Sequence, residues 1–333
     1  MVLHDIEGQP RAIALLEAGL RAGRLHHAYL FTGPAGVGKE QAARAFAQAL
    51  LCGERPGGCG SCSTCRRVEK EIHPDVLWLR GGEEEGESSR EIRVQRIRDL
   101  CAALQLVPIE APRKVALLLG AERMNAAAQN ALLKTLEEPP PRTILILVSE
   151  GDEAILSTIR SRCLRVSFGP LPQELLARQL EREGIAPEEA RLRASLSRGD
   201  GGLARALDAA GLARRSGLTS RLLSIASHAG GEAATLDALG LAEELADREV
   251  ALAALRDAAL VWRDLLVLGG GGGRELIVGR DVVAALERAA PRLPPARVLR
   301  GLAAFRTAIG AIEGNGSPRL QLEAALLRLA EAA

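Results

Sequence analysis

Short apolar runs alternate with helical patterns through the first half of the chain. Between the runs, apolar side chains recur at the three- and four-residue spacing of an amphipathic helix. The runs cover residues 27–33, 75–79, 114–119, 143–149 and 164–168. Strands that alternate with helices usually form a parallel sheet with helices on both faces. The first half therefore predicts an α/β domain built on a five-stranded parallel sheet.

The strand pattern stops after Phe168. Residues 169–172 read Gly-Pro-Leu-Pro, and beyond them leucine, alanine, arginine and glutamate recur at helical spacing. A second, weaker break is expected near residues 211–217, and a pliable glycine run covers residues 269–273. The predicted division is a first domain, a small helical domain and a larger all-helical domain, at residues 1–168, 169–212 and 213–333.

Length and composition are typical of a water-soluble protein with more than one core. The 333 residues exceed the usual size of a single core, 47% are apolar and 26% charged, and no apolar run is long enough to cross a bilayer. The N-terminus lacks the basic and apolar regions of a secretory signal, so we expect a cytoplasmic protein with reduced cysteines. The acidic, glycine-rich stretch 81–89 predicts a solvated loop.

Charge and aromatic content argue against direct reading of nucleic acid. The chain has 43 basic and 42 acidic residues, a net charge of +1, and only 2% aromatic residues. This balance gives no bulk attraction to a phosphate backbone, and the rings are too few for a platform that stacks bases.

A phosphate-binding loop follows the first predicted strand. Residues 33–39 read Gly-Pro-Ala-Gly-Val-Gly-Lys and open a helical pattern, which is the context that a P-loop requires. The backbone around Gly33, Gly36 and Gly38 would wrap a phosphate, and the helix N-terminus would add a positive partial charge. Lys39 would reach the outer phosphates of a nucleotide.

The same loop lacks the side chains that ATP hydrolysis needs. Where a Ser or Thr after Lys39 would bind Mg²⁺, the chain has Glu40, a residue that also suits the first turn of a helix. Acidic residues should follow the strand that ends at Leu119, but the next residue is Gly120. We therefore expect no Mg²⁺ site, no ATPase activity, and weak or no binding of ATP or ADP. Glu122 is the alternative candidate for a substitute base.

Four cysteines lie close together between the first two predicted strands. Cys52, Cys59, Cys62 and Cys65 have the spacing C-x6-C-x2-C-x2-C, set among glycines. Four thiolates suit tetrahedral Zn²⁺, and four protein ligands leave no position for water, so we expect a structural zinc site in an insertion at about residues 52–73. An iron–sulfur cluster and four free thiols are the alternatives.

Several short motifs together resemble the bacterial clamp-loader subunits of the AAA+ family. They are the phosphate loop and the segments 8–9, 23–31, 121–125, 130–140 and 161–163. These motifs cover roughly residues 5–210, and the last third agrees with the family only in being helical. The missing metal and base residues are closer to a non-hydrolysing subunit than to the ATP-hydrolysing gamma/tau subunit.

The resemblance implies a three-domain subunit with an AAA+ core, a helical lid and a helical collar that oligomerises. Its partners would be gamma/tau and delta subunits in a five-subunit loader of DNA polymerase III, a DNA-directed DNA polymerase. The loader opens the sliding clamp and sets it on primer–template DNA, with no membrane involved. The family carries a similar zinc module.

The resemblance also assigns roles to three further residues. Arg162, in the Ser-Arg-Cys element, would lie at a subunit boundary and reach the ATP of the neighbouring subunit, where an arginine stabilises the transferring phosphoryl group. Ser149 would match the sensor position at the end of a strand, and Arg205 the sensor of the lid. On spacing alone, Arg162 would be an ordinary surface ion pair.

Two other functions stay open. The chain could be a catalytically active AAA+ ATPase of the gamma/tau type that uses unconventional groups such as Glu122. It could instead be a zinc-dependent module that binds nucleic acid through the cysteine cluster.

Overall fold

A parallel sheet organises the first half of the chain. Among the residues that the structure describes, 2–81, 91–228 and 230–331, this computed structural model has five strands in the order β2-β3-β4-β1-β5, and every neighbouring pair is parallel. The strands are β1 (Ala28–Thr32), β2 (Val76–Arg80), β3 (Lys114–Leu119), β4 (Thr143–Ser149) and β5 (Leu164–Ser167). Each begins and ends within one residue of its predicted run. The predicted α/β class is confirmed. The predicted acidic loop lies, from residue 82 onward, outside the described residues.

Burial along the strands explains why the sequence showed continuous apolar runs. Every residue of β1, β3 and β4 is buried, whereas the edge strands β2 and β5 are partly exposed. A parallel sheet that is covered on both faces needs apolar residues at successive positions rather than at alternate ones.

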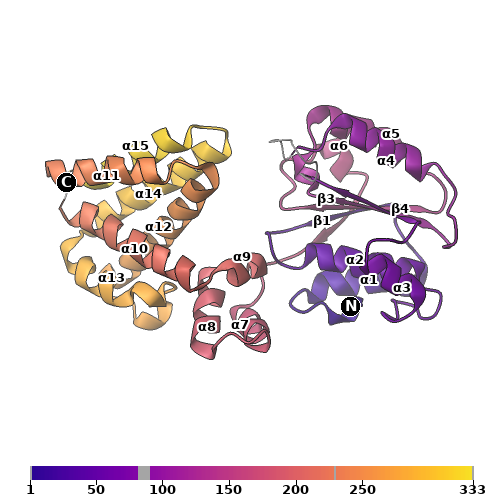
Figure 1. Cartoon of the computed structure of the whole chain (residues 1–333), viewed down its shortest axis with the longest axis horizontal. Helices are drawn as coiled ribbons and strands as arrows, with labels where there is room; N and C mark the ends of the chain where they lie inside the picture. The colour runs from indigo at the N-terminus through magenta and orange to yellow at the C-terminus, as the bar shows by residue number, and fades with distance from the viewer. Residues whose placement is uncertain (1, 82–90, 229, 332–333) are drawn as a thin grey trace. The chain divides into compact units, whose positions relative to one another are not determined.

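Helices cover both faces of the sheet (Figure 1). One face carries α1 (Pro10–Ala22), α2 (Lys39–Leu51) and α3 (Ser63–Glu69), and the other carries α4 (Val94–Leu104), α5 (Ala126–Glu137) and α6 (Ser157–Arg160). Tyr29 and Phe31 of β1 point to the first face, where their rings lie 4.9 and 6.5 Å from that of Phe46 in α2. Ala28 and Leu30 point to the second face and pack in its separate core. Alternate residues of one strand therefore fix two helical layers.

The rest of the described chain is helical. It comprises α7 (Gln173–Arg182), α8 (Pro187–Leu196), α9 (Gly201–Ala206), α10 (Ala209–Ser227), α11 (Glu232–Glu244), α12 (Arg248–Gly269), α13 (Val283–Ala289), α14 (Pro295–Glu313) and α15 (Pro318–Ala330). Short 3-10 turns occur at Leu3–Asp5, Ala121–Arg123, Arg274–Leu276, Arg280–Val282 and Ala290–Arg292. In the part of the chain that is described, none of the helices combines the length and apolar character needed to cross a membrane.

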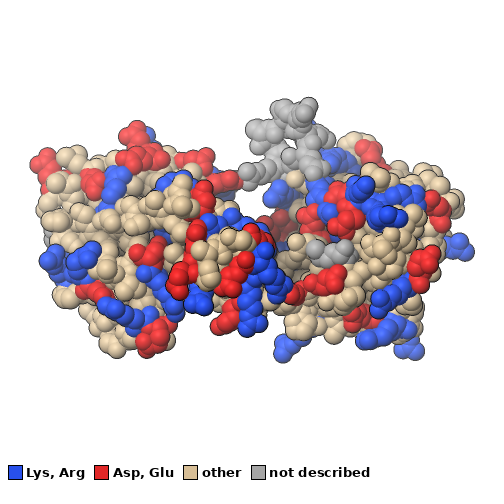
Figure 2. Space-filling view, turned by 60° about the horizontal axis from the view of Figure 1, so that its bottom comes forward, with Lys and Arg blue, Asp and Glu red and all other residues tan. Residues whose placement is uncertain are grey.

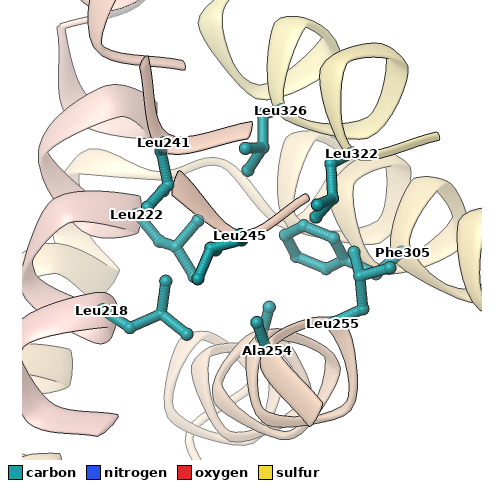
Figure 3. Close-up of a pocket in the computed structure, with 10 residues that line it drawn as sticks. Leu218, Leu222, Leu241, Leu245, Ala254, Leu255, Phe305, Leu322 and Leu326 are labelled. Atoms are coloured by element: carbon teal, nitrogen blue, oxygen red, sulfur yellow. The ribbon is translucent and has the colours of Figure 1, made fainter. Parts of the chain in front are cut away.

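The C-terminal helices share one apolar core. Trp262 of α12 and Phe305 of α14 are fully buried and meet edge to face, with ring centroids 5.1 Å apart. Figure 3 shows a small hollow in this core, lined by leucines, alanines and Phe305. A lining without polar groups has nothing to hold a polar ligand, so this hollow is a packing feature.

The chain divides into two compact units. One comprises Met1–Glu183 with Ser197–Leu203, and the other Gly184–Leu196 with Ala204–Ala333. The weak break expected near residues 211–217 lies within α10, which runs through it without interruption. Tertiary packing outweighs the helix penalty of Gly211 and Gly217 there. The division into three domains at 168/169 and 212/213 stays a prediction.

Candidate functional site

The predicted phosphate loop lies between β1 and α2, at the carboxyl edge of the sheet. Gly33, Gly36 and Gly38 all have positive φ angles, of 150°, 65° and 94°. Gly38 is the N-cap of α2, so Lys39 is the first residue of that helix. Beside the loop, Gln9 is buried and donates to Val37 O at 3.2 Å and Gly169 O at 2.7 Å. These bonds tie the loop to the segment that follows β5.

Lys39 is bonded to its own loop. Its Nζ donates to Gly33 O at 2.7 Å and also to Pro34 O, and the residue is only 7% exposed. Burial lowers the pKa of Lys39, although the charges of Glu150, Glu122 and Asp200 oppose that shift. Two of the three donors of this ammonium are therefore used by loop carbonyls rather than held for a phosphate.

The segment before α9 lies directly on the loop. Gly201 N donates to Gly36 O at 3.1 Å. A Cβ added to Gly36 would lie 1.9 Å from Asp200 Oδ1 and 2.4 Å from Gly202 N. Asp200 Oδ1 also accepts from Gly202 N at 2.8 Å and from Leu203 N at 2.9 Å, so the carboxylate is held in place. The carboxylate of Asp200 and the first turn of α9 therefore lie against Gly36, whose backbone was predicted to face a phosphate. Asp200 was not identified from the sequence. Its only local signal is the N-cap position before α9, whereas its contact with Gly36 joins segments that are distant in the chain.

Glu40 has partners that the sequence did not indicate. Its carboxylate accepts from Arg80 Nη1 at 2.7 Å and from Arg44 Nη2 at 3.2 Å. Both arginines also pair with Glu71. The guanidinium of Arg44 lies 5.4 Å from the ring centroid of Trp78, and that of Arg80 lies 5.7 Å from it. Glu40 thus joins α2 to the end of β2 in addition to occupying a first helical turn.

The strand ends next to the loop carry Ser149 and Glu122. Ser149 of β4 pairs with Thr32 of β1, and Thr32 immediately precedes Gly33 of the loop. It is 1% exposed, and its hydroxyl donates to Gly151 O. Glu122 lies beyond β3, and its Oε2 accepts from Glu150 N at 3.2 Å. The structure therefore brings the predicted sensor serine to the loop, with its hydroxyl proton used locally.

The four cysteines form one cluster. The Sγ atoms of Cys52, Cys59, Cys62 and Cys65 all lie within 4.8 Å of one another, and those of Cys59 and Cys65 are 3.9 Å apart. Four sulfurs at about 2.3 Å from one tetrahedral ion would be separated by similar distances. Backbone N–H groups of Ser61 and Cys62 lower the pKa of Cys59 to about 6, while burial raises the pKa of Cys65 to about 12. The cluster is compatible with structural zinc.

The cysteine cluster is attached to α2 by side chains one and two turns beyond Glu40. Gln48 Nε2 donates to Cys65 O at 3.2 Å and to Glu69 Oε2 at 2.7 Å. Arg44 Nη1 donates to Glu69 O at 3.2 Å. Because α2 begins at Lys39, the cluster supports the same helix that carries the loop lysine.

Arg162 lies apart from the loop, beyond the end of α6. Its Nη2 is 2.9 Å from Glu137 Oε1, and its Nη1 donates to Thr158 O at 2.9 Å and Ser161 Oγ at 3.4 Å. The side chain is 36% exposed. Arg205, in the last turn of α9, belongs to the second unit, and its sensor role stays a prediction.

Charges of both signs mix over the face shown in Figure 2, on each of the two units. This mixture agrees with the net charge of +1. Recruitment of a partner to this face would therefore depend on local contacts rather than on bulk charge.

Comparison with known proteins gives a consistent set of matches. The family described as "DNA polymerase III, delta subunit" matches residues 8–172. DNA polymerase III subunit delta' of Bacillus subtilis is 35% identical over 194 residues, which are 57% of this chain and 56% of that protein. Subunit delta' of Pseudomonas aeruginosa is 44% identical over 165 residues, 47% of this chain and 48% of that protein.

A match to another subunit covers more of the chain. DNA polymerase III subunit tau of Salmonella typhimurium is 34% identical over 274 residues, 79% of this chain and 42% of that protein. The chain spans about half the length of the curated relatives it matches.

Proposed function

We propose that this chain is a delta-prime-type clamp-loader subunit, because residues 8–172 match the DNA polymerase III delta-subunit family and delta' subunits are among its relatives. In this role it does not hydrolyse ATP. It acts instead on ATP held by a neighbouring subunit, and Arg162 is the group that reaches across.

The state of the phosphate loop carries this proposal. The position for a Mg²⁺-binding hydroxyl holds Glu40, whose carboxylate is paired with Arg80. Lys39 is bonded to loop carbonyls, and Asp200 stands against Gly36. Metal ions and positioned charges carry most of phosphoryl-transfer catalysis. A loop in this state supports weak or no nucleotide binding and no hydrolysis.

Arg162 has the exposure and chemistry that a trans-acting arginine needs. Its guanidinium is at the surface and is held by an exposed ion pair, which is worth at most about 1 kcal/mol. Phosphate accepts two parallel hydrogen bonds from a guanidinium. The charge on a transferring phosphoryl group could therefore replace Glu137 as the partner of Arg162.

The cysteine cluster supplies a structural part of the proposal. Cys52, Cys59, Cys62 and Cys65 would hold Zn²⁺ as four thiolates, a closed site that stabilises the fold and supplies no reaction step. The proposed partners are gamma/tau and delta subunits in a five-subunit complex, which loads the sliding clamp onto primer–template DNA.

Steady-state ATP hydrolysis by the reconstituted complex tests the proposal. Arg162→Ala should leave the complex assembled and slow hydrolysis at the neighbouring site by about 10³-fold or more, because transition-state charge loses its partner. Lys39→Ala in the same subunit should leave the rate unchanged. The purified chain alone should show no turnover.

The opposite pattern would favour the active-ATPase alternative. Turnover by the chain alone, abolished by Lys39→Ala and unaffected by Arg162→Ala, would mean that Glu122 or another group replaces the missing base. Salt-dependent binding of primed DNA by the chain alone, lost on chelation of zinc, would favour the nucleic-acid module.

A further inference from the structure

The helix that ends at Glu137 is the platform on which the Arg162 segment rests. Gln129 of α5 is 5% exposed, and its amide donates to Ala154 O at 2.9 Å and accepts from Leu156 N at 2.8 Å. These two bonds fix the entry to α6, and Ile159 of α6 is fully buried in the core that α5 also lines. The backbone that leads to Arg162 is therefore positioned by α5.

The position of Glu137 is electrostatically unfavourable within its own helix. It is the last residue of α5, and Glu138 is the C-cap. Carboxylates at this end of a helix face the negative end of the helix dipole and are unfavourable there. The compensating charge for Glu137 is the guanidinium of Arg162, at 2.9 Å. This pair therefore links the end of one element to the functional side chain of another.

Neighbouring arginines use a different carboxylate. Arg165 Nη1 is 2.8 Å from Asp152 Oδ2, and Arg160 Nη1 is 3.7 Å from the same atom. Asp152 is thus already shared by two cations. Glu137 is the carboxylate that pairs with Arg162.

The contacts of Arg162 leave part of its guanidinium open. A guanidinium has five N–H donors. Within the described chain, Nη1 contacts Thr158 O and Ser161 Oγ, and Nη2 contacts Glu137. Nε and the second hydrogen of Nη2 remain for a ligand, and two such donors can bind a phosphate together.

We propose that Glu137 is the positioning residue for Arg162, whose guanidinium it holds beside the end of α6 before the neighbouring ATP is engaged. The inference rests on the proposed trans role of Arg162. Free arginine side chains lose about 2 kcal/mol of rotamer entropy when they are fixed. An exposed ion pair offsets part of that cost beforehand and is weak enough to adjust when a phosphate binds.

A double-mutant cycle in the reconstituted complex tests this inference. Glu137→Ala should lower kcat for ATP hydrolysis at the neighbouring site by about two- to five-fold, the size expected of an exposed pair, with KM for ATP unchanged. Glu137→Gln keeps an oxygen that accepts from Nη2, so its kcat should lie between those of the wild type and Glu137→Ala. The double variant Glu137→Ala/Arg162→Ala should be no slower than Arg162→Ala alone.

Glu138→Ala is the matched control. It removes the same charge one residue further along and should leave kcat unchanged. A kcat that falls by the same factor whether or not Arg162 is present would overturn the inference, and so would a rise in kcat. If Arg162→Ala itself has no effect, the trans role fails first. If only Arg162→Ala has an effect, the trans role stands and the positioning role of Glu137 fails.

Discussion

The two cations that the sequence marks for phosphate, Lys39 and Arg162, have opposite surroundings. Lys39 is buried and bonded to the carbonyls of its own loop, and the turn that presents Asp200 lies against Gly36 of that loop. Arg162 is at the surface, held by Glu137 and by a backbone oxygen, with two donors to spare. For a phosphate to take the place of the loop carbonyls, the bonds of Lys39 Nζ to Gly33 O and Pro34 O must break. A phosphate that approaches Arg162 displaces little.

The difference is what the proposed function requires, because Lys39 is bonded within its loop and the guanidinium of Arg162 is accessible. The loop of Lys39 now serves the internal packing of the first unit, through Gln9, Asp200 and the arginines that meet Glu40. The Arg162 element stays available because its partners are few and exposed. Variants that change the surroundings of only one of these two cations test whether Lys39 and Arg162 differ in this way.

The largest effect on stability is expected at the cysteine cluster, which contacts α2, the helix that begins at Lys39. Cys65→Ser should reduce the metal content from about one zinc ion per chain to none and destabilise the first unit by more than about 4 kcal/mol. Hydrogen exchange should rise in α2 and α3 far more than in α5 and α6, because Gln48 and Arg44 join the cluster to α2.

Cys101→Ser is the matched control for this prediction. Cys101 lies outside the cluster and is half-buried, so the variant should keep its zinc. A Cys65→Ser protein that retains a full equivalent of zinc, or that loosens α5 as much as α2, would contradict the supporting role of the cluster.

A smaller effect is expected where the Asp200 turn meets the loop. Gly36 and Gly23 have nearly equal φ angles, +65° and +63°, but a Cβ at Gly23 would meet nothing within 4 Å. Gly23→Ala should therefore cost about 1 kcal/mol for the left-handed backbone alone. Gly36→Ala should cost about 1–3 kcal/mol more, because its Cβ would overlap Asp200 and Gly202. Denaturant unfolding of the two variants measures the difference. Equal costs would show that the turn does not rest on the loop in solution.

The smallest effect concerns the affinity for nucleotide. Asp200→Asn removes a negative charge beside the loop, while an asparagine can still cap α9. Titration calorimetry should show ATP binding about two- to five-fold tighter than in the wild type. The control is Asp208→Asn, at the residue that caps α10 by accepting from Gly211 N at 2.7 Å. Asp208→Asn should leave the affinity for ATP unchanged. If Asp200→Asn binds ATP more weakly than the wild type, Asp200 does not oppose nucleotide binding.

Much of the fold could be predicted because its signals are local. The runs that became the central strands β1, β3 and β4 are almost continuous in apolar residues, as buried parallel strands must be. The break expected at residues 211–217 does not interrupt α10, because glycine within a helix is tolerated where packing supplies the stability, and α10 buries Leu222, Leu223 and Ile225. Arg162 also forms the surface ion pair that its spacing alone predicted, and Glu137 is its partner.

The strands, the phosphate loop with its missing hydroxyl and acids, and the spacing of the four cysteines could all be recognised in the sequence. These features depend on residues a few positions apart. Only the tertiary structure decided that Lys39 turns to its own loop, that Asp200 covers Gly36 and that Arg80 takes the carboxylate of Glu40, 40 residues away. The contacts of Asp200 and Arg80 join segments that are distant in the chain. Their partners are chosen by how the sheet and its helices pack, and no periodicity or motif encodes that choice.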